Sequence, residues 1–276
     1  MGAAAALSCL REAGVALPDA IVTGTAYGCL EDTGLFLNGM IERKEEMLQP
    51  AAFIQSTHNT VGAQIALLLQ CTGYNNTIVH RGSSFETALL DAAMLLADGE
   101  AASVLAGGVD EITAASHALL SRFGLYRHGA VAGEGAAFFL LTGRPSGHDL
   151  ARIDAVDSFY KPEGGRDVEE HLLALLHSNG LGPGDIDLLI TGDNGDEGSD
   201  RIYRQVREAL FPGRPVRTYK QLCGEYPTSA SVGLWLAAQQ IRSGAGRVLL
   251  YNHYLNIHHA AYLLSSADNP LSHAAQ

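Results

Sequence analysis

The stretch that decides the fold is TIVHRGSSFETALLDAAMLLADGEAASVLAGGVDE, residues 77–111 of the chain. It begins with a β-branched run typical of a strand and turns sharply at Gly-Ser-Ser. It then continues as an Ala- and Leu-rich helix and ends in a second aliphatic strand. Enzymes use this strand–turn–helix layout to present a nucleophile at the start of a helix. The stretch therefore predicts an α/β protein and raises the question of whether the turn carries a nucleophile.

The composition is that of an ordinary globular protein of 276 residues, with 47% hydrophobic and 17% charged side chains. Only 18 basic residues stand against 30 acidic ones, which gives a formal net charge of −12, and the basic residues are scattered along the chain. Surfaces that bind nucleic acid or anionic membranes need clustered Lys and Arg. We therefore expect neutral molecules or other proteins as partners, and no nucleic acid.

The cysteines and the N-terminal segment favour a cytoplasmic protein. Cys9, Cys29, Cys71 and Cys223 are far apart and form no Cys-x-x-Cys pair, which argues against a zinc site and against a secreted disulfide framework. The opening MGAAAALSCL lacks the basic segment of an export signal and runs into Arg11 as an amphipathic helix does. No apolar run has the length of a membrane span, so we expect no membrane insertion.

An internal duplication organises the chain. Residues 9–28 and 175–195 share one plan: a helix stopped by Gly, a Pro-containing turn, an aliphatic strand and Thr-Gly. Residues 88–108 and 233–253 each give a long helix, a Gly-containing turn and a Val-Leu strand, in the same order. Repeated segments in a fixed order indicate repeated structural units.

The repeats predict two similar α/β halves. Gly14 and Gly180 are expected to end their helices in the left-handed conformation, which glycine adopts without strain. Continuous aliphatic strands alternating with helices indicate largely parallel sheets with helices on both faces. We predict halves of residues 1–146 and 147–276, joined in a five-layered αβαβα arrangement.

Several motifs resemble those of the β-ketoacyl synthases. ADGEAASVLAGGVDE, residues 97–111, is similar to that family's turn and strand ending in Ala-Gly-Gly-x-Glu. RHGAVAGEGAAFFLL, residues 127–141, is similar to its Arg-x-Gly-x-x-x-Gly-Glu-Gly-Ala strand. Residues 181–200 and 219–234 lie, in order, where the family carries its two catalytic-histidine motifs. The resemblance implies the thiolase-like fold, here shortened at the N-terminus by the first strand and helix.

The resemblance also shows which catalytic residues are missing. Enzymes of that family condense acyl chains with a Cys-His-His set, in which a helix N-terminus activates the cysteine and the histidines stabilise an enolate. Counted along the family's motifs, the cysteine falls on Gly82 and the two histidines fall on Gly192 and Glu225. Glu134 and Lys220 match residues that the family retains. YNHYLNIHHAAYLL replaces the Gly-rich closing loop, so we expect no condensation by this chain alone.

The family contains inactive partners of this kind, the chain-length factors. The resemblance implies an accessory subunit that pairs with an active ketosynthase and meets acyl carrier protein only indirectly, through the acyl chain that the carrier holds. It implies no cofactor and no metal. Shortened chains of this type occur in gene clusters for aryl-polyene or flexirubin-type pigments, which is the pathway that the resemblance favours.

The resemblance also assigns an interface. The strand before the turn, consisting of Asn76, Thr77, Ile78, Val79 and His80, is expected to pair across the dimer axis. Residues 51–62 are expected to line the partner's acyl tunnel. Phe53, Gln55 and Phe85 are candidates for its floor, and for the two phenylalanines an ordinary place in the core is an equally good interpretation.

Other functions remain open from the residues alone. An acyl hydrolase or acyltransferase could use Ser83 or Ser84, although no Gly-x-Ser-x-Gly motif is present and a serine at a helix start is commonly a cap. A malonyl decarboxylase would need the histidines that the chain lacks. A metal site built from residues 252–259 and 193–200 lacks the spacing of a calcium loop.

Overall fold

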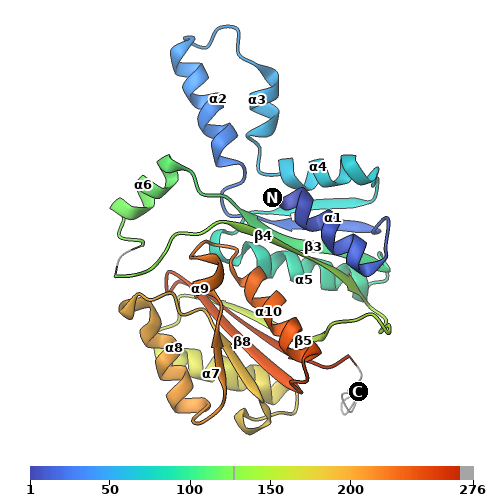
Figure 1. Cartoon of the computed structure of the whole chain (residues 1–276), viewed down its shortest axis with the longest axis vertical. Coiled ribbons are helices and arrows are strands. Elements are labelled where there is room, and N and C mark those ends of the chain that lie inside the picture. The colour runs from blue at the N-terminus through green and yellow to red at the C-terminus, as the bar shows by residue number, and fades with distance from the viewer. Residues whose placement is uncertain (127, 268–276) are drawn as a thin grey trace. The chain divides into compact units, whose positions relative to one another are not determined.

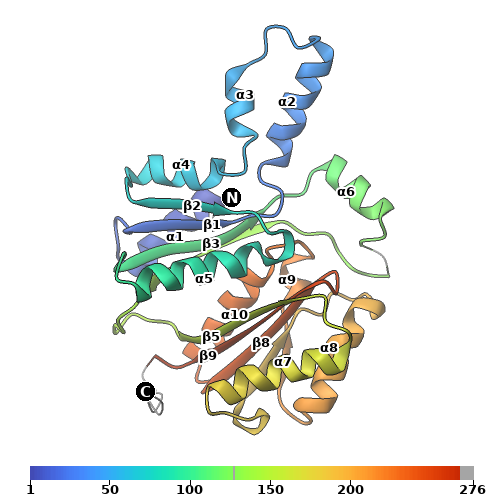
Figure 2. The same cartoon turned by 180° about the vertical axis from the view of Figure 1, so that it is seen from behind.

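The computed structural model describes residues 1–126 and 128–267 of the chain. Arg127, which opens one of the family motifs, lies outside the described residues. The prediction of an α/β protein is confirmed, because helices alternate with the strands of two separate sheets. The chain divides into two compact units, each drawn in Figures 1 and 2. The predicted sequence halves, 1–146 and 147–276, describe a duplication, which stays a prediction.

The first compact unit contains Met1–Gly143 together with two segments from later in the chain, Asn194–Asp196 and Lys220–Val232. Its four strands lie in the order β2-β1-β3-β4, and only β4 is antiparallel to its neighbour. Its elements are α1 (Gly2–Ala13), β1 (Ala20–Gly24), α2 (Leu30–Glu42), α3 (Pro50–Gln55), α4 (Thr60–Leu69), β2 (Tyr74–Ile78), η1 (Arg81–Ser83), α5 (Ser84–Ala97), β3 (Ser103–Asp110), α6 (Ala114–Arg122), β4 (Gly135–Thr142), α9 (Lys220–Cys223) and the start of α10 (Ala230–Arg242).

Both faces of this first sheet are covered by helices, as the aliphatic strands predict. Leu10 of α1 and Ile65 of α4 pack with Ile21 and Leu105 of the central strands on one face. Helix α5 lies against the other face, where Phe85 is fully buried (Figure 2). α1 ends, as predicted, at Gly14, whose φ of 68° is left-handed.

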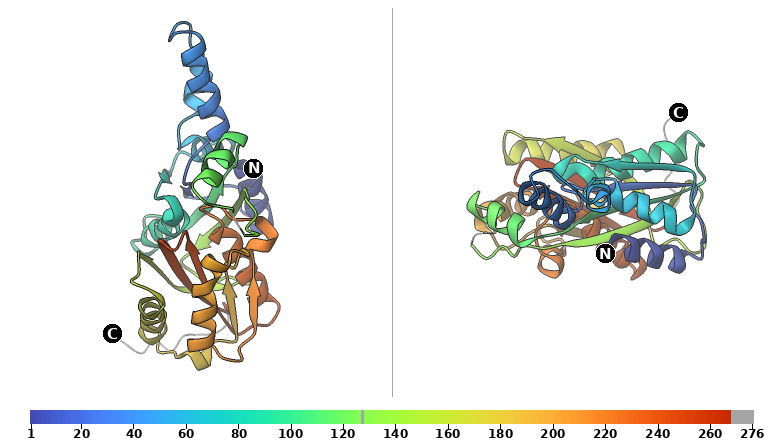
Figure 3. Two further views of the ribbon diagram at one scale, coloured as in Figure 1. Left: turned by 90° about the vertical axis from the view of Figure 1, so that its left-hand side faces the viewer. Right: turned by 90° about the horizontal axis from the view of Figure 1, so that it is seen from above.

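Helices α2 and α3 form an arm that extends beyond the sheet of the same unit (Figures 1 and 3). Neither helix contains a buried residue. Phe36 and Phe53 hold the arm together with ring centroids 5.3 Å apart, yet Phe53 keeps 55% of its surface exposed. The interpretation of Phe53 as an ordinary core aromatic is therefore wrong within this chain, whereas the same interpretation fits Phe85. Gln55 is exposed as well.

The second compact unit contains Arg144–Asp193, Glu197–Tyr219 and Gly233–Gln276. Its five strands lie in the order β5-β9-β8-β6-β7. Its elements are β5 (Arg152–Tyr160), α7 (Gly165–Ser178), η2 (Pro183–Asp185), β6 (Leu188–Thr191), α8 (Glu197–Leu210), β7 (Val216–Thr218), most of α10, β8 (Arg247–Tyr254) and β9 (His258–Ser265). The prediction of a largely parallel sheet fits four of these strands, which run in the same direction, whereas β9 runs antiparallel to both of its neighbours, β5 and β8.

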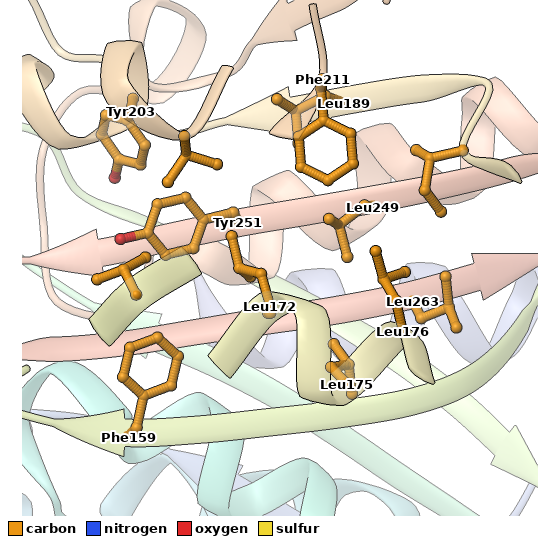
Figure 4. Packing of buried hydrophobic residues seen from close by; sticks show 14 residues of the cluster. Phe159, Leu172, Leu175, Leu176, Leu189, Tyr203, Phe211, Leu249, Tyr251 and Leu263 are labelled. Carbon is orange, nitrogen blue, oxygen red and sulfur yellow. The ribbon is translucent and has the colours of Figure 1, made fainter. Parts of the chain in front are cut away.

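The core of the second unit lies between its sheet and helices α7 and α8. Leu172 and Leu176 of α7 meet Tyr203 of α8 and the strand residues Leu249 and Tyr251 there (Figure 4). Gly180, with a φ of 70°, follows α7 in the predicted left-handed conformation. Over residues 1–126 and 128–267, no helix is both long enough and apolar enough to cross a membrane.

The closing segment of the second unit forms a tight hairpin. β8 and β9 are joined by Leu255, Asn256 and Ile257; the first two have positive φ, and the amide of Ile257 donates to the carbonyl of Tyr254 at 3.1 Å. This is the conformation of a type I′ turn, which usually contains glycine. The segment predicted to replace the family's Gly-rich loop forms a strand pair.

Candidate functional site

The turn at residues 80–84, predicted as the position of the family's nucleophile, connects β2 to α5. Gly82 lies buried in η1, directly before α5. The Ser84 hydroxyl accepts the amide of His80 at 2.8 Å and donates to the carbonyl of Arg81 at 2.8 Å, which closes the turn. A Cβ on Gly24 would lie 2.5 Å from the Ser84 carbonyl oxygen, so strand β1 approaches this turn backbone to backbone.

The same hydrogen bonds give Ser84 a structural role. Its side chain is fully buried and bonds backwards to the turn, rather than to the amides of the first helical turn as a cap would. Thr87 donates to the carbonyl of Ser83 at 2.8 Å and is the hydrogen-bond partner of His80 Nδ1 at 3.2 Å. That ring nitrogen is therefore engaged by a threonine and not by either serine, which is the opposite of what a serine nucleophile needs.

Glu225, predicted to stand where the family carries its second catalytic histidine, takes part in a buried ion pair. Its Oε2 lies 2.9 Å from Nζ of Lys220 and accepts a hydrogen bond from the side-chain amide of Asn194 at 2.6 Å. The side chains of Lys220 and Glu225 are 1% and 8% exposed, so both charges are removed from water. Glu225 Oε1 is buried and has no hydrogen-bond partner among the described residues. Because the carboxylate is paired with the ammonium group of Lys220, it offers no hydrogen-bond donor to an oxyanion.

The glycines of the retained Gly-Glu-Gly motif explain how the Glu225 loop is held. The Glu225 amide donates to the carbonyl of Val131 at 2.8 Å, and the Gly133 amide donates to the Glu225 carbonyl at 3.1 Å. A Cβ on Gly133 would collide with the Cys223 carbonyl and would lie 2.7 Å from Cα of Gly224. The two glycines therefore allow two backbones to touch, whatever side chain stands at position 225.

The remaining residues of that motif are also structural. A Cβ on Gly135 would lie 2.5 Å from the hydroxyl of Tyr226, so this glycine makes room for the residue after Glu225. Glu134, which matches a family residue, is exposed and accepts the amide of Ile112 at 3.1 Å. The motif thus fixes a loop, and its retention does not require catalysis.

Asp110, at the end of β3, is a buried residue that sequence reasoning missed. Its Oδ1 accepts the Thr25 hydroxyl at 3.0 Å and the amides of Ala26 and Tyr27 at 2.8 and 3.3 Å. Its Oδ2 accepts the amide and the hydroxyl of Thr228 at 3.2 and 2.8 Å. Burial raises the pKa of this carboxyl, and the hydrogen bonds oppose that rise. An acidic residue at the end of an aliphatic strand was the available signal.

A shallow cavity of about 400 Å³ lies beside the loop that contains Val131 and Ala132. It is lined by Ile112, Thr113, Ala114, His117, Val131 and Ala132. His117 stacks on Tyr126 with ring centroids 5.4 Å apart. Burial, followed by the charge of Glu225, raises the pKa of Tyr126 to about 12, so the phenol remains neutral.

Gly192, the position of the first catalytic histidine, belongs to the second compact unit. It directly follows β6, between Thr191 and Asp193, whose side chains are hydrogen-bonded to each other. Asp193 also pairs with Arg207 of α8 at 2.9 Å. An ion pair and a glycine therefore occupy the end of β6, where the resemblance predicts the position of the first histidine.

The histidine-rich hairpin of the second unit gives no metal site in the described part of the chain, where no group of three or more His, Cys, Asp or Glu could hold an ion. His253 Nδ1 accepts the amide of Asn256 at 3.2 Å, which leaves Nε2 to donate to the Ser199 carbonyl at 3.1 Å. His259 Nδ1 is engaged by the Tyr251 hydroxyl at 2.9 Å. Burial lowers the pKa of His259 to about 4.

Strand β2, predicted as the interface strand, is an edge of its sheet. It spans Tyr74–Ile78, two residues earlier than the predicted segment, so Val79 and His80 follow the strand. In the described chain it pairs only with β1, and its outer edge is open. The strand, the residue that follows it and the two helices that contact it carry exposed apolar residues; these are Tyr74, Val79, Leu67 and Leu68 of α4, and Leu90 and Met94 of α5. We refer to this group with the strand as the edge surface.

Comparison with known proteins supports the resemblance found in the sequence. Residues 4–122 match the model of the beta-ketoacyl synthase N-terminal domain family. The structure of the ishigamide ketosynthase/chain length factor matches with a TM-score of 0.76 and 20% identity, covering 91% of this chain and 74% of that one. No curated protein sequence is significantly similar to the chain.

Two further solved structures share the fold. A beta-ketoacyl synthase from Burkholderia phymatum matches with a TM-score of 0.78 and 16% identity, over 96% of this chain and 81% of that one. The ketosynthase ApeO in complex with its chain length factor ApeC, from Xenorhabdus doucetiae, matches with a TM-score of 0.74 and 14% identity, over 94% and 77%. The thiolase-like fold is thereby confirmed, as is the resemblance to β-ketoacyl synthases.

Proposed function

We propose that this chain is a catalytically inactive, chain-length-factor-like subunit that completes a ketosynthase heterodimer in the cytoplasm. The observation that carries the proposal is the buried Lys220–Glu225 pair at the position of a catalytic histidine. A carboxylate there would repel the enolate that the family's histidine stabilises, and loss of a single oxyanion donor costs about 2.7–4 kcal/mol in hydrolases. Gly82 supplies no atom to be acylated.

The edge surface and the α2–α3 arm support a dimeric role. An open strand edge that is flanked by apolar side chains is a template for pairing with another sheet. The arm exposes Ile41, Met47, Phe53 and Ile54 and buries nothing within its own chain. In this proposal β2 pairs with the partner's sheet, and the arm lies on the partner.

Within the heterodimer, the active subunit supplies the cysteine and both histidines and receives acyl groups from acyl carrier protein. This chain limits the room for the growing acyl chain through Phe53, Gln55 and Phe85. Phe53 and Gln55 are available because they are exposed on the arm. Phe85 packs against Phe139 with ring centroids 6.0 Å apart, and it shapes the interior next to the turn that contains Gly82. Aryl-polyene or flexirubin-type chains are the product class that we favour.

Co-expression with a ketosynthase encoded beside this chain tests the proposal. We expect a stable complex that condenses malonyl groups on acyl carrier protein and loses this activity when the partner's cysteine is replaced. Condensation by this chain alone would overturn the proposal. Thioester hydrolysis that Ser83→Ala or Ser84→Ala abolishes would instead establish the serine-dependent alternative.

Product length tests the assignment of the tunnel residues. Phe53→Ala in the heterodimer should give longer products, because it removes bulk from the proposed floor of the tunnel, although it also removes the ring contact with Phe36. Gln55→Ala should act in the same direction. Phe85 is fully buried, so Phe85→Leu is the better variant, since truncation to Ala would cost about 3–5 kcal/mol. Ile41→Ala, on the same arm, should leave product length unchanged.

A further inference from the structure

The carboxylate of Asp91 is hydrogen-bonded to two residues of β2 in the edge surface, and the charge of a second carboxylate, Glu100, also acts on Tyr74. Asp91 of α5 accepts the Tyr74 hydroxyl at 3.1 Å through Oδ2, and the same oxygen accepts the Asn76 side-chain amide at 3.2 Å. The Asn76 amide also donates to the Tyr74 hydroxyl at 3.0 Å. The three side chains form a closed set that fixes Asp91 against β2, on the flank of α5 that faces the strand edge.

The charge of Asp91 is not neutralised within the described chain. Both of its hydrogen-bond partners are neutral, and no Lys, Arg or His of residues 1–126 and 128–267 forms an ion pair with it. Exposed apolar side chains neighbour it on the same helix, since Leu90 is 40% exposed and Met94 is 63% exposed. A partner that covers this surface would therefore remove an unpaired carboxylate from water, which is costly unless the partner brings a positive charge.

Pairing of two copies through β2 would place two such carboxylates together. A two-fold axis relates the two strands of a symmetric pair, so they run antiparallel and the residue on the axis meets its own copy. Full overlap of the five-residue strand puts its middle residue, Asn76, on that axis. Asp91, bonded to Asn76, would then face its copy, whereas Arg81 would lie opposite Cys71, at the far end of the ladder.

From this geometry we infer that Asp91 discriminates against self-pairing and selects a partner with a Lys or Arg at the corresponding place. The inference takes the identity of the partner, an active ketosynthase, from the proposed function. It takes the charge that the partner must carry from the edge surface. The apolar residues supply attraction to either kind of partner. The carboxylate decides between them, because like charges oppose one arrangement and opposite charges favour the other.

A mixing experiment with this chain alone tests the discrimination. The charge-reversing variant Asp91→Lys and the wild-type chain are analysed separately and as an equimolar mixture, by analytical ultracentrifugation at low and high salt. We expect the mixture to dimerise at least about tenfold more tightly than either chain alone, because only the mixed pair brings opposite charges together. The advantage should shrink at high salt. Glu208→Lys, a charge reversal on exposed α8, serves as the matched control and should give no advantage.

A neutral variant covers the case in which Asp91→Lys folds poorly. Asp91→Asn keeps the shape of the side chain and removes its charge, and it should self-associate about tenfold more tightly than the wild-type chain. Equal self-association of the wild-type chain, Asp91→Asn and the mixture would overturn the inference. That result would leave the proposed function untouched, because heterodimer formation and dependence on the partner's cysteine are measured separately. In the heterodimer, Asp91→Lys should weaken the complex at least about tenfold, while Glu208→Lys should not.

Discussion

The two compact units bury their polar side chains in different ways. The first unit buries ionisable groups that pair with each other or are surrounded by donors, namely Lys220 with Glu225, and Asp110 with five hydrogen bonds. The second unit buries mainly neutral rings and an amide, although it also contains the Arg152–Asp154 ion pair, in which the Asp154 side chain is 1% exposed. Tyr219 donates to the Asn252 side chain at 2.7 Å, and the His253 amide donates to the Tyr203 hydroxyl at 2.9 Å.

The difference determines how each interior can fail. A buried charge is tolerated only while its partner is present, so the first unit is vulnerable to the loss of a partner. A buried neutral imidazole is tolerated only while it stays unprotonated, so the second unit is vulnerable to acid. Each kind of interior can therefore be tested with a perturbation that leaves the other intact.

Removal of a charge partner should give the largest effect. Lys220→Met leaves the Glu225 carboxylate buried with only the Asn194 amide, and it should lower the free energy of unfolding by about 3–5 kcal/mol. The double variant Lys220→Met/Glu225→Leu should recover most of that loss, because it removes both charges. Urea unfolding of the four chains in this cycle measures the coupling. Lys161→Met, at an exposed lysine, is the control, and an equal loss there would contradict the comparison.

Acidification should destabilise the second unit through His259. Its pKa is lowered from 6.5 to about 4, so between these values the unfolded chain binds a proton that the folded chain does not. The contribution of neutral His259 to the free energy of unfolding is fully present above pH 6.5. It is lost as the pH falls toward 4, by up to about 3 kcal/mol. The variant Tyr251→Phe/His259→Phe removes the titrating ring together with its hydroxyl partner. It should flatten the pH dependence of unfolding in this window, and an unchanged slope would refute the assignment.

The glycine contact of the first unit should show a smaller effect. Gly133→Ala places a methyl group against the Cys223 carbonyl and the Gly224 backbone, and it should destabilise the chain by about 1–3 kcal/mol. Gly147→Ala is the matched control, because a Cβ there meets nothing within 4 Å. Thermal unfolding of both variants measures the difference. Similar melting temperatures would show that the two backbones can separate at low cost.

The hairpin turn of the second unit offers a small gain. Leu255 has a φ of 61° and is 44% exposed, so it bears the strain of a left-handed residue without full burial in return. Leu255→Asn should stabilise the chain by about 0.5–1 kcal/mol, because Asn suits this position of a type I′ turn. Leu17→Asn, at an exposed leucine without positive φ, should give no gain in the same measurement.

Much of the fold could be predicted from the sequence because its signals are local. Aliphatic runs predicted strands, and Gly14 and Gly180 predicted the ends of helices. The structure confirms both. The antiparallel course of β9 could not be read from its apolar residues, because a buried strand is equally apolar in either direction. The Leu255–Asn256 turn was missed because it lacks the glycine that usually marks a type I′ turn.

The candidate site was less predictable, because its contacts join distant segments. Counting along the motifs placed Gly82 and Glu225 at the catalytic positions. The partners of Glu225 include Asn194, which is 31 residues away, and no local pattern reports such a pair. The five hydrogen bonds of Asp110 come from two segments that lie on either side of it in the sequence. A buried carboxylate with distant partners is visible only once the chain is folded.

The arm formed by α2 and α3 also bears on how the protein must be made in a cell. A chain that leaves Ile41 78% exposed and Met47 90% exposed presents the kind of surface that chaperones and proteases recognise. Copies in excess of the proposed partner would keep this surface uncovered and would be the first to aggregate or be degraded. Matched synthesis of the two subunits would then set the amount of this chain that accumulates.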